Sequence, residues 1–497
     1  MTRTAVAAGS SRSPTASALA QWVLVASIAW GVFAFGAVYP WAFWPLVVGI
    51  LVVVLDGLLT TARPRAALEP RALSIALAAL VLLIVVQLVP LPLSIVRALS
   101  PATVESIVQL DPTAAAGLVA LHPLSIDPSL TVVGLVLFGS FALLLISAVR
   151  LFSIWGTRSI SQAIAIVGVL VALVGIIQQP LYAGKIYGFW QPLMSGSPYG
   201  PFVNKNHFAG WMLMALPLTL GLACGGIARG MHGVEGTFRA QLLWFSSPDA
   251  SRLVLLCGAA VIMALALVLT MSRSGMCALA LALALTGIQV LHHVQRGIPR
   301  AVGVSFLVLV STMAVWWVGA GTIANRFDKA NWREFNDRKG AWFDAIGIAK
   351  RFPLTGSGLN TYGSVTLLYQ QHDLAQHYAE AHNDYLQFAA EGGVLLVVPA
   401  IACVVLFAAA ARRRLREETS VTTYWIRTGA LTGIAAIALQ EIVEFSLQMP
   451  GNALLFVVLC AIALHRTPER KGRSAIRMLV PSCEHAPSET AVVSTTG

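Results

Sequence analysis

Apolar runs long enough to cross a lipid bilayer recur throughout this chain of 497 residues. A hydrocarbon core of ~30 Å needs a helix of about 20 apolar residues, and about twelve stretches of roughly 17–22 residues meet that need. Of all residues, 57% are hydrophobic and only 11% are charged, unlike a soluble domain of this length. The sequence therefore predicts an all-α, polytopic membrane helix bundle. The predicted spans lie at 19–37, 41–59, 72–92, 131–149, 160–179, 207–227, 252–271, 275–292, 301–320, 393–411, 428–447 and 452–465.

Arginine and lysine residues collect after every second predicted span. Short cytoplasmic loops of membrane proteins carry an excess of these residues, so the even-numbered spans are predicted to end inside, with both termini cytoplasmic. The basic residues are Arg63, Arg65, Arg71, Arg150, Arg158, Arg229, Arg239, Arg252, Arg296, Arg300, Arg412, Arg413, Arg414, Arg416, Arg466, Arg470, Lys471 and Arg473.

One membrane domain, residues 19–465, accounts for most of the chain. Residues 1–18 are rich in Ser, Ala and Thr and lack the pattern of a cleavable signal peptide, and the composition of residues 466–497 is typical of disorder. We expect both end segments to be disordered and cytoplasmic. The predicted outer loops are 93–130, 180–206 and 321–392, of which the last is the largest polar segment.

The usual sequence signatures of nucleotide and metal sites are missing. There is no GxxxxGK phosphate loop, no GxGxxG turn, no HExxH helix and no Asp-x-Asp pair. The six cysteines have neither metal-ligand spacing nor a disulfide pattern. We therefore expect no metal, no cofactor and no nucleic-acid partner, and we look for chemistry among the polar groups of the outer loops.

The first outer polar group is Arg273 in MSRSG, residues 271–275. This connection between two spans is too short for a loop, so the sequence places the arginine at the tip of a helical hairpin. One interpretation is an arginine that merely snorkels to the lipid headgroups. The alternative is a functional cation, which is favoured because a positive charge on the outer face opposes the positive-inside trend.

The large outer loop contains a second candidate arginine. NDRKGAWFDAIGIAKRF begins at Asn336 and predicts a helix in the interface plane, with Trp342, Ile346 and Ala349 facing lipid. Arg338 lies one turn before Trp342, on the same side of that helix. It would contact either lipid headgroups alone or a phosphate carried by a lipid substrate.

Two further motifs of this loop have alternative interpretations. GSGLNTYG, residues 356–363, is either an ordinary turn or an anion site made by backbone N–H groups. In AEAHNDYLQFAAEGG, His382 begins a helical pattern and is either a structural hydrogen-bonding residue or a group that exchanges a proton near neutral pH. Asn383 suits sugar hydroxyls and helix capping equally well.

Two polar groups complete the predicted outer rim. Lys205 and Asn206 open the sixth span in GPFVNKNHFAGW. In QEIVEF of the eleventh span, Glu441 and Glu444 are three residues apart and are predicted on one helix face. Carboxylates at membrane depth are functional or paired, so they suggest either a proton relay or a salt bridge to one of the arginines.

Together these motifs resemble the bacterial O-antigen ligase and polysaccharide polymerase family. The order of GPFVNKNHFAGW, SRSG, NDRKGAWFDAI, FPLTGSGLNTY, AHNDYLQFAAEGG and EFSLQMPGNALLF is similar to that family from about Pro180 to Leu464. The resemblance implies a C-type membrane glycosyltransferase with a large periplasmic loop of short helices. It also implies an undecaprenyl-diphosphate-linked glycan as donor, and either lipid A core sugars or another lipid-linked repeat unit as acceptor.

The resemblance also suggests roles for individual residues. The outer-face arginines of the family map onto Arg273 and Arg338, and its loop histidine maps onto His382. Family members often have Asp where this chain has Glu444. Many also have an arginine before the middle span, where the nearest cations here are Lys185 and Lys205. We add as candidate substrate-binding residues Lys205, Asn206, Arg326, Asn383 and Glu444.

The resulting hypothesis is a metal-independent displacement at the anomeric carbon. Arg273 and Arg338 would hold the diphosphate oxygens, and His382 would assist the acceptor hydroxyl. The resemblance implies inverting stereochemistry. Ligase and polymerase remain equal alternatives, at the periplasmic face of a bacterial inner membrane. A lipid-linked glycan transporter or flippase would place charges near mid-membrane, and a scaffolding protein would leave the clustered Arg, His and Glu residues unexplained.

Overall fold

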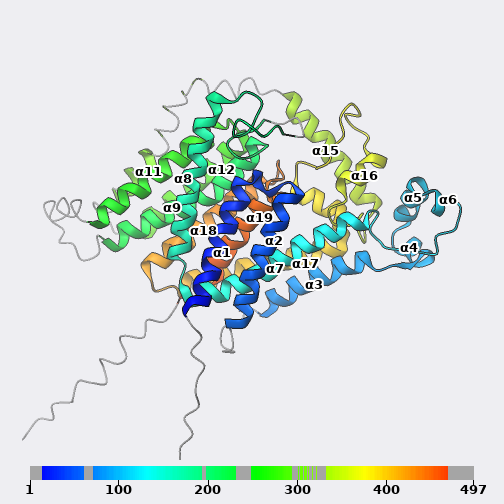
Figure 1. The fold of residues 1–497 in the computed structure, drawn as a ribbon, viewed down its shortest axis with the longest axis horizontal. Coiled ribbons are helices and arrows are strands. Elements are labelled where there is room, and N and C mark those ends of the chain that lie inside the picture. Colours follow the sequence, from blue (N-terminus) through cyan, green and yellow to red (C-terminus); the bar gives the residue numbers. More distant parts are fainter. Residues whose placement is uncertain are drawn as a thin grey trace, which may run out of the picture.

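The computed structural model describes residues 14–60, 71–192, 197–230, 248–293 and 332–467, with scattered positions between 300 and 321. These residues form a bundle of long helices with shorter helices on one end and flank (Figure 1). The predicted span at 301–320 is only partly described. Arg326 and most of the predicted terminal segments lie outside the described residues. Residues 14–18, predicted to be disordered, belong to the first helix.

The described helices confirm the predicted all-α, polytopic membrane fold. Within this part of the chain, eight helices are long and apolar enough to cross a membrane, and two shorter apolar helices accompany them. The eight are α2 (Pro40–Thr60), α3 (Arg71–Leu88), α7 (Pro128–Trp155), α8 (Arg158–Leu181), α9 (Lys205–Gly230), α11 (Pro248–Leu269), α12 (Arg273–His293) and α17 (Asp384–Glu417). The shorter helices are α1 (Pro14–Phe33), apolar from Ala18, and α19 (Pro450–Leu464), and α18 (Val421–Gln440) also belongs to the bundle.

Helix α9 is the central helix of the described bundle. In the most apolar 18-residue part of α9, 89% of the residues are buried. The helix packs along the length of α18. Glycines make this approach possible: a Cβ at Gly429 would lie 2.5 Å from the carbonyl of Pro217, and one at Gly433 would lie 2.9 Å from that of Met214. Small residues let membrane helices pack closely. The pairing fixes the beginning of α9 next to the end of α18.

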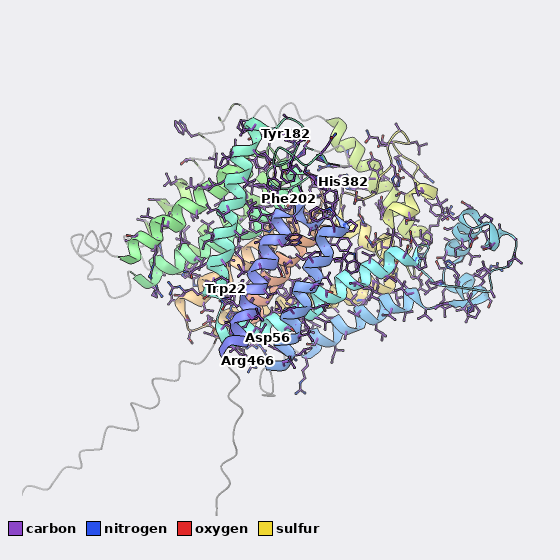
Figure 2. The ribbon with its side chains drawn as sticks, in the orientation of Figure 1. Trp22, Asp56, Tyr182, Phe202, His382 and Arg466 are labelled. Carbon is purple, nitrogen blue, oxygen red and sulfur yellow. The ribbon has the colours of Figure 1, made fainter. Side chains whose placement is uncertain are left out.

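The described parts of the predicted outer loops gather at one end of the bundle. Figure 2 shows Tyr182, Phe202 and His382 toward this end, whereas Asp56 and Arg466 lie at the opposite end. The ends of α8, α11 and α18 and the beginnings of α9, α12 and α17 meet here. We refer to it as the outer end and to the other as the inner end.

Short elements cover the outer end and its flank. They are α4 (Leu93–Leu99), α5 (Pro101–Leu110), α6 (Pro112–Ala115), α15 (Trp332–Arg351), α16 (Tyr362–Tyr369) and the 3₁₀ helices η1 (Phe35–Ala37) and η3 (Ser446–Gln448). Strands β1 (Leu91–Pro92) and β2 (Leu121–His122) pair antiparallel, with Leu91 opposite His122. Buried side chains of α15, α16 and α17 form a separate small core.

Helix α15 forms where it was predicted, but its most buried stripe is different. Ala341, Ala345 and Ile348 are fully buried and face the protein, because the helix packs against α16 and α17. The prediction that Trp342, Ile346 and Ala349 face lipid is wrong for Trp342, whose indole N–H donates to the carbonyl of His382 at 3.2 Å, and for Ala349, which packs against the small core.

Two helix ends also differ from the predictions. Helix α17 begins at Asp384 and contains a break at Gly393 (φ 54°, ψ −165°), so His382 precedes the helix rather than beginning it. Helix α18 ends at Gln440, which places Glu441 at its C-cap and Glu444 in the following turn. The predicted common helix face for these two carboxylates is therefore wrong.

Candidate active site

A cavity of about 520 Å³ lies at the outer end, where these helix ends meet. Its walls come from the beginnings of α9 and α12, from α15, from the turn before α17 and from the segment after α18. The lining residues are Ser197, Asn204, Lys205, Asn206, Met271, Ser272, Arg273, Ser274, Cys277, Arg338, His382, Leu439, Ile442, Val443 and Glu444. The structure thus brings together six predicted site residues: Lys205, Asn206, Arg273, Arg338, His382 and Glu444.

The tight turn between α11 and α12 positions Arg273 at the cavity. Within it, the backbone N–H of Ser272 donates to Oγ1 of Thr270 at 3.1 Å, and Oγ of Ser272 accepts the N–H of Gly275 at 3.3 Å. A Cβ at Gly275 would lie only 2.9 Å from the Cβ of Ala209 on α9. The small glycine lets α12 pack closely on α9, which places Arg273 beside the first turn of that helix.

Arg338 reaches from α15 to the segment after α18. Its Nη2 atom lies 2.7 Å from Oε1 of Glu444, and its Nη1 atom donates to the carbonyl of Val443 at 3.1 Å. The side chains of Asn206 and Ser274 also interact with the Glu444 carboxylate. Burial raises the pKa of Glu444, and the positive charge of Arg338 opposes that rise. Of the two roles predicted for Glu444, the structure shows the salt bridge, which is made to Arg338.

His382 lies at the cavity wall in an unusual backbone conformation. Its φ of 50° is rare for a residue other than glycine, and its carbonyl accepts the indole N–H of Trp342. The imidazole meets the ring of Phe445 edge to face at 4.8 Å, and His207 meets the same ring at 4.7 Å. Burial and the charge of Arg338 lower the pKa of His382 to about 4, so the imidazole is neutral at pH 7.

Backbone contacts at the start of α9 fix Lys205 and Asn206. The N–H of Lys205 donates to the carbonyl of Ser197 at 2.8 Å, and that of Asn206 donates to Oδ1 of Asn204 at 2.9 Å. The carbonyl of Asn206 accepts the side-chain amide of Gln440 at 2.9 Å. These contacts hold the first turn of α9 against the end of α18.

The loop histidine and both arginines belong to one continuous stretch of the chain. Residues 258–401 match the O-antigen ligase family model. The predicted resemblance to this family is thus confirmed over the stretch that contains Arg273, Arg338 and His382. The match supports a membrane glycosyltransferase of the ligase or polymerase type. No curated protein matches the chain.

Within the O-antigen ligase stretch, the GSGLNTYG turn binds a carboxyl group of the protein itself. Oε2 of Glu391 accepts the backbone N–H of Asn360 at 2.8 Å, and Oε1 accepts that of Tyr362 at 3.0 Å. The turn N–H groups therefore contact a carboxyl group of α17, and the anion site suggested by the sequence stays a prediction. This contact fastens the loop to the membrane helix.

The predicted substrate-binding residue Asn383 does not line the described cavity. Oδ1 of Asn383 accepts the N–H of Leu386 at 3.0 Å as the N-cap of α17, and its Nδ2 donates to the carbonyl of Ile442 at 2.8 Å. Of the two roles predicted for Asn383, the structure shows helix capping. Arg326 lies outside the described residues.

Several groups of the site were not predicted from the sequence. Ser272 and Ser274 line the cavity, and the ring of Phe445 contacts the imidazoles of both His207 and His382. MSRSG predicted the position of Arg273 at a hairpin tip but no role for its serines. The position of both serines beside Arg273 in that turn was the signal for their place at the cavity, whereas nothing in the sequence indicates the contacts of Phe445.

The arrangement can bind an anion and accept a proton at the same place. Lys205, Arg273 and Arg338 give the cavity three cationic side chains, and Glu444 is its one carboxylate among the described lining residues. Guanidinium groups bind phosphate oxygens in a bidentate manner. Beside them, the neutral imidazole of His382 can take a proton from a hydroxyl group.

Proposed function

We propose that this protein is a glycosyltransferase of the bacterial inner membrane that moves a glycan from undecaprenyl diphosphate to an acceptor glycan. The observation that carries the proposal is one cavity lined by Lys205, Arg273 and Arg338 together with the neutral imidazole of His382. A diphosphate-linked sugar needs cations at its leaving group and a base near its acceptor. The reaction takes place on the periplasmic face, with both termini cytoplasmic.

Arg273 and Arg338 hold the diphosphate. They approach from different elements, α12 and α15, so their guanidinium groups can contact the two phosphates from two sides. Glu444 and the carbonyl of Val443 hold Arg338 in place, which means that little reorganisation is needed as negative charge develops. Arg273, Arg338 and Lys205 supply the positive charge that the diphosphate leaving group needs. The transfer therefore needs no metal ion.

His382 accepts the proton of the attacking hydroxyl. The acceptor oxygen forms a bond to the anomeric carbon while the bond from that carbon to the diphosphate oxygen breaks, and undecaprenyl diphosphate leaves. The proton passes to His382, whose pKa of about 4 without substrate is set by burial and by Arg338. A bound diphosphate offsets the charge of Arg338 and makes the imidazole a stronger base. One displacement of this kind inverts the anomeric configuration.

The acceptor distinguishes the two closest alternatives. A ligase passes the glycan to the sugars of the lipid A core, whereas a polymerase passes it to another lipid-linked repeat unit. The shared cavity serves both reactions equally. A transporter of lipid-linked glycan is the alternative of a different class, and it would bind the same diphosphate without forming a new glycosidic bond.

The test uses the full-length protein in proteoliposomes with an undecaprenyl-diphosphate-linked oligosaccharide. Lipid A core and a second lipid-linked repeat unit are offered as separate acceptors, with and without a chelator. We expect one new glycosidic product that persists with the chelator and is lost in Arg273→Ala, Arg338→Ala and His382→Ala. Arg351→Ala is the matched control, because this exposed arginine lies on α15 outside the cavity. Donor movement between leaflets without a product would instead identify a transporter.

A further inference from the structure

A second cavity, of about 530 Å³, lies at the inner end of the bundle between α8, α9 and α11. It is lined by Arg158 at the start of α8, Arg229 near the end of α9 and Arg252 in the first turn of α11. On α9, Arg229 follows Lys205 by 24 residues, so at 1.5 Å per residue it lies about 36 Å along the helix from the candidate active site. The cavity is therefore a separate site, and we call it the inner groove.

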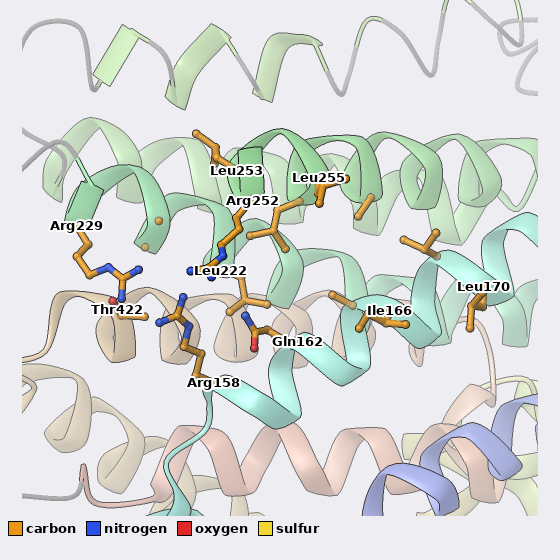
Figure 3. Close-up of a pocket in the computed structure, with 16 residues that line it drawn as sticks. Arg158, Gln162, Ile166, Leu170, Leu222, Arg229, Arg252, Leu253, Leu255 and Thr422 are labelled. Carbon is orange, nitrogen blue, oxygen red and sulfur yellow. The ribbon is translucent and has the colours of Figure 1, made fainter. Parts of the chain in front are cut away.

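The inner groove is polar at one end and apolar along the rest of its length. Figure 3 shows the guanidinium groups of Arg158, Arg229 and Arg252 turned toward a common space, with Gln162 and Thr422 beside them. Guanidinium groups bind phosphate oxygens in a bidentate manner. This end of the groove therefore suits a ligand that carries a phosphate group.

The other part of the groove suits a hydrocarbon chain. Ile166 and Leu170 of α8 and Leu255 of α11 line it, with exposed fractions of 62%, 49% and 74%. Figure 3 places Ile166 and Leu170 along α8, away from the arginines. In a bilayer these side chains face the lipid tails, so a ligand with its headgroup at the arginines can lay an acyl chain along them.

We propose that the inner groove binds one anionic glycerophospholipid, such as phosphatidylglycerol or cardiolipin. The phosphate lies among Arg158, Arg229 and Arg252, and an acyl chain follows Ile166 and Leu170. Basic pockets between membrane helices on the cytoplasmic side bind such headgroups, and the predicted topology places this end in the cytoplasmic leaflet. A zwitterionic lipid fits less well, because its ammonium group adds a further positive charge to the cluster.

Gly226 allows the groove to be filled without removing its charges. This glycine of α9 lines the groove, and a Cβ built on it meets no other atom within 4 Å. In Gly226→Phe the new ring would occupy the space of the lipid while all three arginines remain. Gly258 on α11 is the matched control, since a Cβ there also meets nothing within 4 Å but the residue does not line the groove.

The experiment is native mass spectrometry of the purified full-length protein with phosphatidylglycerol, cardiolipin, phosphatidylethanolamine or undecaprenyl phosphate added singly. We expect the wild type and Gly258→Phe to retain the two anionic glycerophospholipids at least tenfold better than phosphatidylethanolamine. Gly226→Phe and the triple variant Arg158→Gln, Arg229→Gln, Arg252→Gln should lose that preference. As a charge control, Arg412→Gln, Arg413→Gln and Arg416→Gln remove three arginines at the inner end outside the groove and should keep it.

Three results would overturn the proposal. Equal retention by wild type and Gly226→Phe would mean that lipid does not occupy the groove. Equal loss in both triple variants would reduce the effect to general surface charge. Preference for undecaprenyl phosphate over the glycerophospholipids would assign the groove to a carrier lipid instead. None of these results depends on glycosyltransferase activity.

Discussion

The Nη2 atom of Arg338 lies 2.7 Å from Oε1 of Glu444, whose side chain is only 1% exposed. The same guanidinium donates to the carbonyl of Val443, so two acceptors fix its position at the cavity wall. Cations held in place before a reaction stabilise developing negative charge more effectively than mobile ones. The contact therefore couples the segment after α18 to Arg338 of α15, which we propose binds the donor diphosphate.

Removing the Glu444 carboxylate should slow glycan transfer even though this residue need not touch the substrate. In Glu444→Gln, Arg338 keeps only its hydrogen bond to Val443 and loses its charged partner, so we expect the transfer rate to fall about tenfold or more. Glu444→Asp keeps a carboxylate on a shorter side chain and should retain an intermediate rate. Product formation in proteoliposomes, at equal amounts of inserted protein, measures both effects.

The second Arg–Glu pair of α15 provides the control for this prediction. Arg351 and Glu105 are 3.2 Å apart, but their side chains are 50% and 58% exposed, and exposed pairs contribute only about 0–1 kcal/mol. We expect Glu105→Gln to transfer glycan at the wild-type rate. An equal loss in Glu105→Gln and Glu444→Gln would contradict a specific role for the buried pair.

The rate should depend on pH through His382. Burial and Arg338 lower its pKa to about 4, and a general base acts when it is unprotonated. We therefore expect kcat/KM to rise as pH increases through about 4 and then to stay level toward neutral pH. In Arg338→Gln the electrostatic contribution disappears and the pKa of His382 rises, which an NMR titration of the imidazole measures without turnover. An unchanged pKa of His382 in this variant would contradict the coupling to Arg338.

Close packing at Gly275 should control the position of Arg273. A Cβ there would lie 2.9 Å from the Cβ of Ala209, so Gly275→Ala forces α12 away from α9. Small displacements of positioning groups cost up to about 100-fold in rate, and we expect at least a tenfold loss although Arg273 is still present. Gly287→Ala on the same helix is the control, because its Cβ would meet Leu307 at 3.8 Å. Equal rates for the two variants would exclude this packing effect.

The membrane helices were largely predictable because each depends on a local apolar run. The predicted span at 160–179 corresponds to α8 at Arg158–Leu181, and that at 275–292 corresponds to α12 at Arg273–His293. Arg273 was placed correctly at a hairpin tip for the same reason, since a turn between two long runs leaves it no other position. The end of α18 at Gln440 was missed, because the first glycine or proline after Gln440 is Pro450. The sequence therefore has no helix-breaking residue where the helix ends.

The contacts that assemble the site were less predictable because they join residues far apart in sequence. Arg338 and Glu444 are separated by about a hundred residues, and the hydrogen bond from Arg338 to the carbonyl of Val443 spans 105 positions. The sequence offered two roles for Glu444 and two for Asn383 without a means of choosing between them. Tertiary packing decides both, since each side chain meets its partner only after α15, α17 and α18 have come together.

Glu391 should be essential for the order of the large outer loop. Its carboxyl group accepts the N–H groups of Asn360 and Tyr362, and a typical intramolecular hydrogen bond contributes about 0.5–1.5 kcal/mol. We expect Glu391→Ala to expose the GSGLNTYG turn, so that limited proteolysis cuts near Asn360 faster than in wild type. Glu417→Ala, at the exposed end of α17, is the control and should be cut at the wild-type rate. Unchanged proteolysis of Glu391→Ala would show that the turn is held by its other backbone contacts alone.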